Sequence, residues 1–235
     1  MPNNHPALTL HMHPLASYCW KVLVALYEAQ TPFRTVQIDG VPKDNPVYSA
    51  LWPMAKMPLL QDGEGVVPET SIIIEYLQAH HHLGSTILIP AEADAAREVR
   101  LWDRFFDLYV HTPMQKFVSD RMRPESAKDP LGVNEARATL DTAYVMLDRR
   151  MAERTLAAGD AFSMADCAAM PALFYADAVH PYRAAYPALA AYFERLVNRP
   201  SVQPVVREAQ PWLQYFPFAD ALEQRFLAAP ATSTQ

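Results

Sequence analysis

Residues 8–30 read LTLHMHPLASYCWKVLVALYEAQ, and the hydrophobic period of this stretch changes near its middle. In residues 8–13 apolar and polar side chains alternate, which predicts a β-strand that Pro14 ends. From Ser17 to about Gln30 the apolar residues recur at helical spacing, which predicts an α-helix. The chain therefore opens with a strand followed directly by a helix.

The same alternation continues to about residue 84. A second strand is predicted at 34–38, a short helix at 47–52, a hairpin around Asp62-Gly63-Glu64, and a further helix at 70–80. The order strand, helix, strand, short helix, hairpin, helix is that of a three-layer thioredoxin-like fold, which we predict for residues 1–84.

Strand signals stop after Gly84. We interpret residues 85–93 as a linker and residues 94–235 as an all-helical domain. The helices are predicted at about 91–121, with a kink at Pro113, and at 133–156, 164–178 and 187–197. The predicted fold class is α/β plus all-α, in two joined units.

Composition narrows the functional class. The 235 residues are 51% hydrophobic and carry a net charge of −6 without a dense Lys/Arg run, which argues against a nucleic-acid partner. The start of the chain lacks the apolar stretch of a signal peptide, and the longest apolar run, 72–77, is too short to cross a membrane. The two cysteines, Cys19 and Cys167, have no metal-binding spacing. We therefore expect a cytoplasmic protein with free thiols and no metal.

Residues 16–22, Ala-Ser-Tyr-Cys-Trp-Lys-Val, lie where the first helix begins. A helix amino terminus offers unpaired N–H groups and partial positive charge, which favour an anion such as a thiolate. The Ser17 hydroxyl can donate a hydrogen bond to that anion, although a serine here can also serve only as the helix cap.

Three further segments contain candidate motifs. Residues 52–58 read Trp-Pro-Met-Ala-Lys-Met-Pro, and residues 68–77 read Pro-Glu-Thr-Ser-Ile-Ile-Ile-Glu-Tyr-Leu. Residues 159–166, Gly-Asp-Ala-Phe-Ser-Met-Ala-Asp, end in Ser163 and Asp166, a capping-box variant that we interpret as structural.

Together these four segments resemble the cytosolic glutathione S-transferases over about residues 8–206. Residues 16–22 are similar to the zeta-class signature Ser-Ser-Cys-Ser-Trp-Arg-Val of maleylacetoacetate isomerase-like bacterial members. Ala16 stands where that signature has its first serine, the residue usually credited with stabilising the thiolate. Ser17 is therefore the candidate catalytic residue of this chain.

The resemblance implies glutathione as a co-substrate and assigns binding residues. The Met57–Pro58 bond is expected to be cis, so that the Met57 backbone pairs with the cysteinyl unit, and Lys56 can reach the glycyl carboxylate. Glu69 and Thr70 are expected to hold the γ-glutamyl ammonium and carboxylate. Either Glu69 or Thr70 can instead be part of an ordinary helix start.

The activity that this resemblance implies is a glutathione transferase of detoxification type, in which the bound thiolate attacks a small electrophilic or hydrophobic substrate. A glutathione-dependent isomerase, a thiol–disulfide oxidoreductase using Cys19, and a non-catalytic glutathione-binding or ligand-carrying protein remain alternatives. The resemblance also implies a homodimer.

The histidines do not suggest a metal site. His80, His81 and His82 are adjacent, so on a helix they point in different directions. His11 and His13 would share one strand face, but no third ligand is evident.

Overall fold

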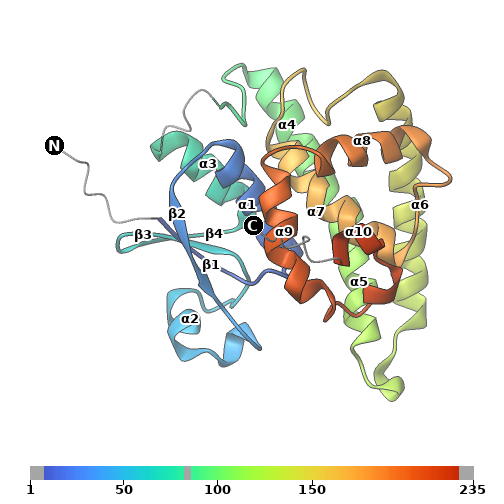
Figure 1. The fold of residues 1–235 in the computed structure, drawn as a ribbon, viewed down its shortest axis with the longest axis horizontal. Coiled ribbons are helices and arrows are strands. Elements are labelled where there is room, and N and C mark those ends of the chain that lie inside the picture. Colours follow the sequence, from blue (N-terminus) through green and yellow to red (C-terminus); the bar gives the residue numbers. More distant parts are fainter. Residues whose placement is uncertain (1–7, 82–85, 228–235) are drawn as a thin grey trace, which may run out of the picture.

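The computed structural model describes residues 8–81 and 86–227, and its elements follow the predicted order (Figure 1). The strands are β1 (Leu8–Met12), β2 (Phe33–Gln37), β3 (Leu59–Asp62) and β4 (Gly65–Pro68). The helices among them are α1 (Ser17–Glu28), η1 (Pro42–Asp44), α2 (Pro46–Leu51) and α3 (Thr70–His80). The predicted thioredoxin-like arrangement is confirmed.

The four strands form one sheet in the order β2-β1-β3-β4. β1 is parallel to β2 and antiparallel to β3, with Leu10 opposite Leu60, and β3 and β4 form the predicted hairpin. In Figure 1, α1 and α3 lie on one side of the sheet and α2 on the other. Because β1 is an inner strand covered on both faces, even its polar residues Thr9 and His11 are buried. His11 Nε2 lies 3.0 Å from Gln61 Oε1.

From residue 93 onward the described chain contains helices and turns. The elements are α4 (Ala93–Phe105), η2 (Phe106–His111), α5 (Thr112–Arg121), η3 (Glu125–Ala127), α6 (Pro130–Glu153), α7 (Met164–Val179), α8 (Pro187–Val197), α9 (Val202–Leu213), η4 (Ala219–Ala221) and α10 (Gln224–Leu227). The predicted all-helical second half is confirmed in these residues.

The long helix predicted at 91–121 departs from α-helical form earlier than Pro113. Residues 106–111 form a π-helix, and the Thr112 N–H bonds to the Asp107 carbonyl oxygen five residues back. Pro113 lies in the first turn of α5, where its missing N–H is tolerated. The irregularity is therefore a π segment, a feature found frequently at functional sites.

The two halves share one core, in which α7 is central. Every residue of α7 except Asp177 is buried. The Trp20 ring of α1 packs against Phe174 and Tyr175 of α7, with ring centroids 4.8 and 5.2 Å apart. This packing fixes α1, and the pocket at its amino-terminal end, against the helical half.

The start of α7 has the predicted capping box. Ser163 and Asp166 bond reciprocally, and Asp166 also accepts hydrogen bonds from the Ala157 N–H and the Tyr192 hydroxyl. With 0% of its surface exposed, Asp166 stabilises the fold and does not contact a ligand site.

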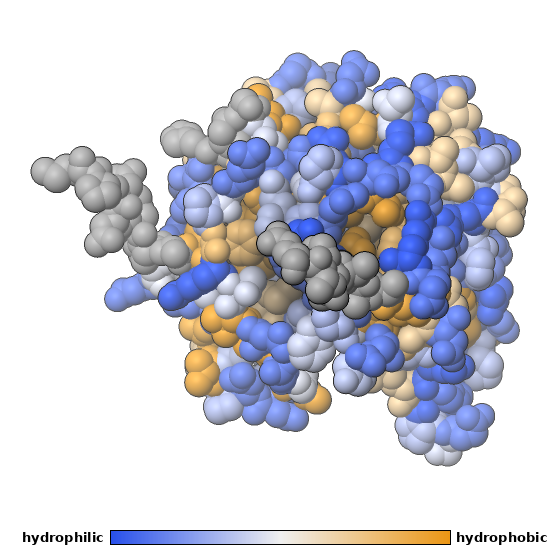
Figure 2. All heavy atoms as spheres, in the orientation of Figure 1, coloured by the Kyte–Doolittle hydropathy of each residue, from blue (hydrophilic) through white to orange (hydrophobic). Residues whose placement is uncertain are grey.

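Charged and polar side chains dominate the face seen in Figure 2, and apolar surface gathers over α2. Val41 and Val47, beside and within α2, are 60% and 72% exposed. In the predicted linker, Leu88 and Ile89 are buried, and Gln78 Oε1 accepts hydrogen bonds from both of their N–H groups. None of the helices described in residues 8–81 and 86–227 has the length and apolar character to cross a membrane.

Candidate functional site

A pocket of about 440 Å³ lies where the sheet-containing half meets α4 and η2. Its volume is in the range of small-ligand sites. The lining residues are Tyr18, Met54, Lys56, Met57, Pro58, Glu69, Thr70, Arg104, Asp107, Leu108 and Thr112. Five of the six predicted site residues are thus brought together, and Ser17 is not among the lining residues.

Residues 54–58 and 69–70 form what we call the main-chain wall. The peptide bond between Met57 and Pro58 is cis, as predicted. The Tyr48 hydroxyl of α2 donates to the Lys56 carbonyl oxygen at 2.6 Å and so holds the loop before β3 in place. The Lys56 side chain is exposed and contributes positive charge to this wall.

The second part of the main-chain wall is the start of α3. Glu69 precedes the helix with φ of 69°, in the region that non-glycine residues rarely adopt, and its side chain does not cap the helix. Such backbone outliers cluster at ligand-binding and active sites. Thr70, the first helical residue, is 8% exposed and lines the pocket. The uncapped N–H groups at this helix start suit an anion.

Arg104, Asp107, Leu108 and Thr112 form the helical wall, which the sequence analysis did not predict. These residues come from the end of α4, from η2 and from the start of α5. The sequence does contain one indication of this wall, namely polar residues at helical spacing within an aromatic-rich helix.

A buried charge network lies beneath the pocket. Lys21 of α1 is 0% exposed, and its Nζ lies 2.6 Å from Asp103 Oδ1 and 2.8 Å from Asp107 Oδ2. Ser71 Oγ accepts from Lys21 and Arg104 and donates to Asp103, and Arg104 also pairs with Asp107 at 2.7 Å. Burial raises the pKa of the Asp107 carboxyl, and Lys21 opposes that shift. Two cations thus balance two carboxylates where α1, α3 and α4 meet.

Ser17 and its neighbour Tyr18 face different surroundings. Ser17 is 3% exposed, its Oγ lies 2.6 Å from His111 Nε2, and Gln115 Nε2 donates to it at 2.9 Å. Tyr18 lines the pocket, and its ring stacks on His111 with centroids 3.7 Å apart and planes 5° from parallel. The predicted catalytic hydroxyl therefore faces the helical half, and an unpredicted tyrosine faces the pocket.

Burial controls the ionisation of two groups near this site. It lowers the pKa of His111 to about 3, so the imidazole is neutral at pH 7. It raises the pKa of the Cys19 thiol to about 12, so that thiol stays protonated. Cys19 and Cys167 are both buried and free.

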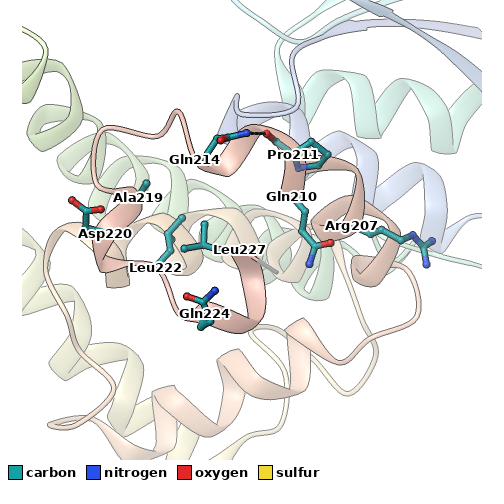
Figure 3. A pocket seen from close by; sticks show the side chains of 9 residues that line it. All are labelled: Arg207, Gln210, Pro211, Gln214, Ala219, Asp220, Leu222, Gln224 and Leu227. Atoms are coloured by element: carbon teal, nitrogen blue, oxygen red, sulfur yellow. Dashed lines mark hydrogen bonds between the residues drawn. The ribbon is translucent and has the colours of Figure 1, made fainter. Parts of the chain in front are cut away.

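A second cavity lies elsewhere. It measures about 820 Å³ and is lined by residues of α9 and of the segment up to Leu227 (Figure 3). Its polar lining consists of three glutamines, Arg207 and Asp220, and Gln214 donates to the Pro211 carbonyl oxygen. None of the predicted site residues lines it, so we do not assign the site there.

Histidines do not assemble with other ligands in the described part of the chain. No group of three His, Cys, Asp or Glu side chains in residues 8–81 and 86–227 could hold a metal ion. His81 Nε2 instead lies 2.7 Å from Asp62 Oδ2, and His82 falls outside the described residues.

Comparison with known proteins gives matches over both halves. Residues 10–85 match the family model of the glutathione S-transferase N-terminal domain, and residues 129–195 match that of the C-terminal domain. Glutathione S-transferase 3 of Zea mays is 30% identical over 208 residues, 85% of this chain and 93% of the relative. A glutathione S-transferase of Pseudomonas putida is 28% identical over 159 residues, 68% of this chain and 70% of the relative.

A solved structure agrees with the fold. The glutathione S-transferase of Methylobacterium radiotolerans, in complex with glutathione sulfonate, superposes with a TM-score of 0.76 at 24% identity. The match covers 85% of this chain and 94% of that one.

Proposed function

Because this chain belongs to the glutathione S-transferase family, we propose that it binds glutathione in the 440 Å³ pocket and stabilises the thiolate for attack on an electrophile. One observation carries the proposal: residues predicted for the tripeptide from separate segments, 56–58 and 69–70, line a single pocket. The pocket is also bounded by the amino-terminal ends of α1 and α3, which favour anions.

In the proposed complex each part of glutathione has a partner on the main-chain wall. The Met57 backbone pairs with the cysteinyl unit, and the exposed Lys56 ammonium group attracts the glycyl carboxylate. Thr70 and the first N–H groups of α3 bind the γ-glutamyl carboxylate, and Glu69 accepts from the γ-glutamyl ammonium. The adjoining Arg104 and Asp107 add one charge of each sign beside this zwitterion.

The proposed place of thiolate stabilisation is the start of α1. Ala16 precedes the helix and has no side chain that could cap it, so the first-turn N–H groups have no side-chain cap partner. Two hydroxyl side chains follow, those of Ser17, the predicted residue, and Tyr18. An anion at this position gains from the helix dipole and from a donated hydrogen bond.

We place transferase chemistry ahead of a zeta-like isomerase. The signature match rests partly on Trp20, Lys21 and Val22. Trp20 Nε1 donates to the Pro14 carbonyl oxygen at 2.7 Å, Lys21 sits in the buried charge network, and Val22 is core. These contacts explain the residues by packing, independently of the second substrate.

Thiol–disulfide exchange by this chain's own cysteine is disfavoured. The nucleophile in such chemistry is an accessible thiolate. Cys19 is 0% exposed and its pKa is raised to about 12. The electrophilic second substrate and a detoxifying role stay part of the transferase proposal.

We also propose a homodimer, with the second copy seated on α4, η2 and α6. A groove of about 600 Å³ runs between these helices, lined mainly by apolar residues including Phe105 and Met146. Leu101, Leu108 and Tyr109 are each more than half exposed nearby. Light scattering at micromolar concentration should give twice the 26.4 kDa of one chain, and the monomer mass would contradict the dimer.

The proposed organisation keeps the predicted boundaries. Residues 1–84 form the glutathione-binding domain, 85–93 the linker and 94–235 the helical domain. A cytoplasmic location accords with two cysteines that remain unpaired.

Binding and turnover are tested separately. Calorimetry with S-methylglutathione, which lacks the thiol proton, measures affinity, and conjugation to a generic aromatic electrophile measures turnover. Thr70→Val should weaken binding about ten- to hundredfold, because it removes a hydrogen bond to a carboxylate. Thr155→Val, the same change at an exposed position just after α6, is the matched control and should leave the affinity unchanged.

The outcomes separate the candidate functions. Binding with turnover supports the transferase, and binding without turnover supports a glutathione-binding module. No binding by the unaltered protein, or equal effects of Thr70→Val and Thr155→Val, would contradict the proposed site.

A further inference from the structure

Three side-chain hydroxyls line the pocket, those of Tyr18, Thr70 and Thr112. The proposed function assigns Thr70 to the γ-glutamyl carboxylate. Thr112 Oγ1 donates its single proton to the Asp107 carbonyl oxygen at 2.8 Å, so it has none left for a ligand. Among the lining residues, Tyr18 therefore has the hydroxyl that can donate a hydrogen bond to the glutathione sulfur.

Ser17 is engaged away from the pocket. Its Oγ contacts His111 of η2 and Gln115 of α5, and only 3% of the residue is exposed. To reach a ligand sulfur, Ser17 would have to give up a 2.6 Å hydrogen bond inside a closely packed junction. Ser17 is thus well placed to hold α1 against η2 and α5, and poorly placed to contact a ligand.

We propose that the Tyr18 hydroxyl donates the hydrogen bond that stabilises the bound glutathione thiolate, and that Ser17 acts as a positioning residue through His111. This inference rests on the proposed function, namely that glutathione occupies this pocket. The thiol proton leaves to solvent, and Tyr18 keeps its own proton throughout.

The geometry orients the Tyr18 ring before the ligand arrives. Tyr18 is the second residue of α1, at the end of the helix whose N–H groups favour an anion. Its ring lies flat on the His111 ring at 3.7 Å. His111 is fully buried and is fixed at Nε2 by Ser17. A ring held on a fixed support loses little further freedom when its hydroxyl binds sulfur.

The Tyr18 hydroxyl favours a charged acceptor. Hydrogen bonds to ionised groups are roughly twice as strong as those between neutral groups, so a bound thiolate gains more from this donor than a bound thiol does. Burial also raises the pKa of Tyr18 above its usual range, so the donor stays protonated while a thiol ionises.

Tyr18→Phe is the direct test, because it removes one oxygen and keeps the ring on His111. We expect conjugation at neutral pH to slow about tenfold and the pH–rate profile to shift up by about one unit. The ultraviolet absorbance of the bound thiolate should titrate with the same shift. Affinity for S-methylglutathione should stay within about twofold, because that ligand has no thiolate to stabilise.

Ser17→Ala tests whether Ser17 acts only by positioning Tyr18. The shift of its pH–rate profile should be smaller than the shift in Tyr18→Phe. The double variant should behave like Tyr18→Phe alone, because Ser17 acts only through the tyrosine. A Tyr18→Phe profile that coincides with the unaltered enzyme overturns the proposal. So does a Ser17→Ala shift that persists undiminished in the Tyr18→Phe background.

The binding measurement separates this inference from its premise. If the unaltered protein does not bind S-methylglutathione, the proposed function is wrong and the role of Tyr18 falls with it. If the ligand binds and only the predicted profile shift is missing, the glutathione site stands and the role of Tyr18 is wrong.

Discussion

The main-chain wall of the pocket and its helical wall differ in what they offer a ligand. Residues 54–58 and 69–70 offer mostly backbone: a cis peptide bond, a helix start without a side-chain cap, and one exposed lysine. Residues 104–112 offer side chains that belong to a buried charge network and a ring stack. A backbone site depends on short local motifs, whereas the helical wall depends on how α1 and α4 pack together.

The largest effect is expected from disrupting the buried charge network that connects the two walls. Lys21→Met removes the fully buried cation that Asp103 and Asp107 share and leaves them only the half-exposed Arg104. Removing one partner of a buried ion pair costs about 3–5 kcal/mol, so the free energy of unfolding should fall by that amount in urea denaturation.

Arg97→Met is the matched control for that experiment. Arg97 pairs with Asp94 on the exposed side of α4, with both side chains more than three-quarters exposed. The cost there should be within about 0–1 kcal/mol. Equal effects of the two variants would mean that the Lys21 network does not join the walls.

Lowering the pH should reduce the free energy of unfolding, because the buried His111 beside the helical wall resists protonation. The pKa of His111 is lowered from 6.5 to about 3 in the folded protein, so below pH 6.5 the unfolded state binds a proton that the folded state refuses. The stability from a neutral His111 is present above pH 6.5 and is lost toward pH 3, at about 1.4 kcal/mol per pH unit. At pH 5 the loss should be about 2 kcal/mol.

His111→Gln, which keeps a nitrogen donor near Nε2, should remove this part of the pH dependence when urea midpoints are compared at pH 7 and pH 5. His80→Gln, at the exposed end of α3, should retain it. A His111→Gln protein with the full pH dependence would contradict the assignment to His111.

The smallest effect is expected from Cys19→Ala. Burial keeps this thiol protonated, with a pKa of about 12, so kcat/KM should stay within about twofold of the unaltered enzyme. Alkylation of the native protein by iodoacetamide at pH 8 should also leave Cys19 unmodified. Abolished conjugation in Cys19→Ala would instead favour the thiol-exchange chemistry.

The main-chain wall could be predicted from the sequence because it is built from local motifs, whereas the helical wall depends on tertiary packing. The order of strands and helices follows from local hydrophobic periods, and residues 56–58 and 69–70 belong to short motifs that keep their spacing. The sequence also placed Ser17 and Tyr18 at the start of α1. Successive residues on a helix point about 100° apart, so one of the two must face away from the pocket. Only the position of His111, more than ninety residues later, determines which one does.

The helical wall was missed because its residues form no compact motif. Arg104, Asp107 and Thr112 acquire a shared direction from the π segment at 106–111, and a sequence pattern does not distinguish that segment from an ordinary helix. The prediction at 91–121 accordingly placed the disturbance at Pro113.

The π segment also gives this helix a place that can absorb one residue. In an α-helix each added or removed residue turns everything beyond it by about 100°. Here the Thr112 N–H bonds five residues back, to Asp107, so the loss of one residue from 106–111 closes that turn to the ordinary i to i−4 bond and leaves Gln115 facing Ser17. Among relatives, a one-residue gap in this stretch is therefore a change in the helical wall of the pocket and not a change in the orientation of α5.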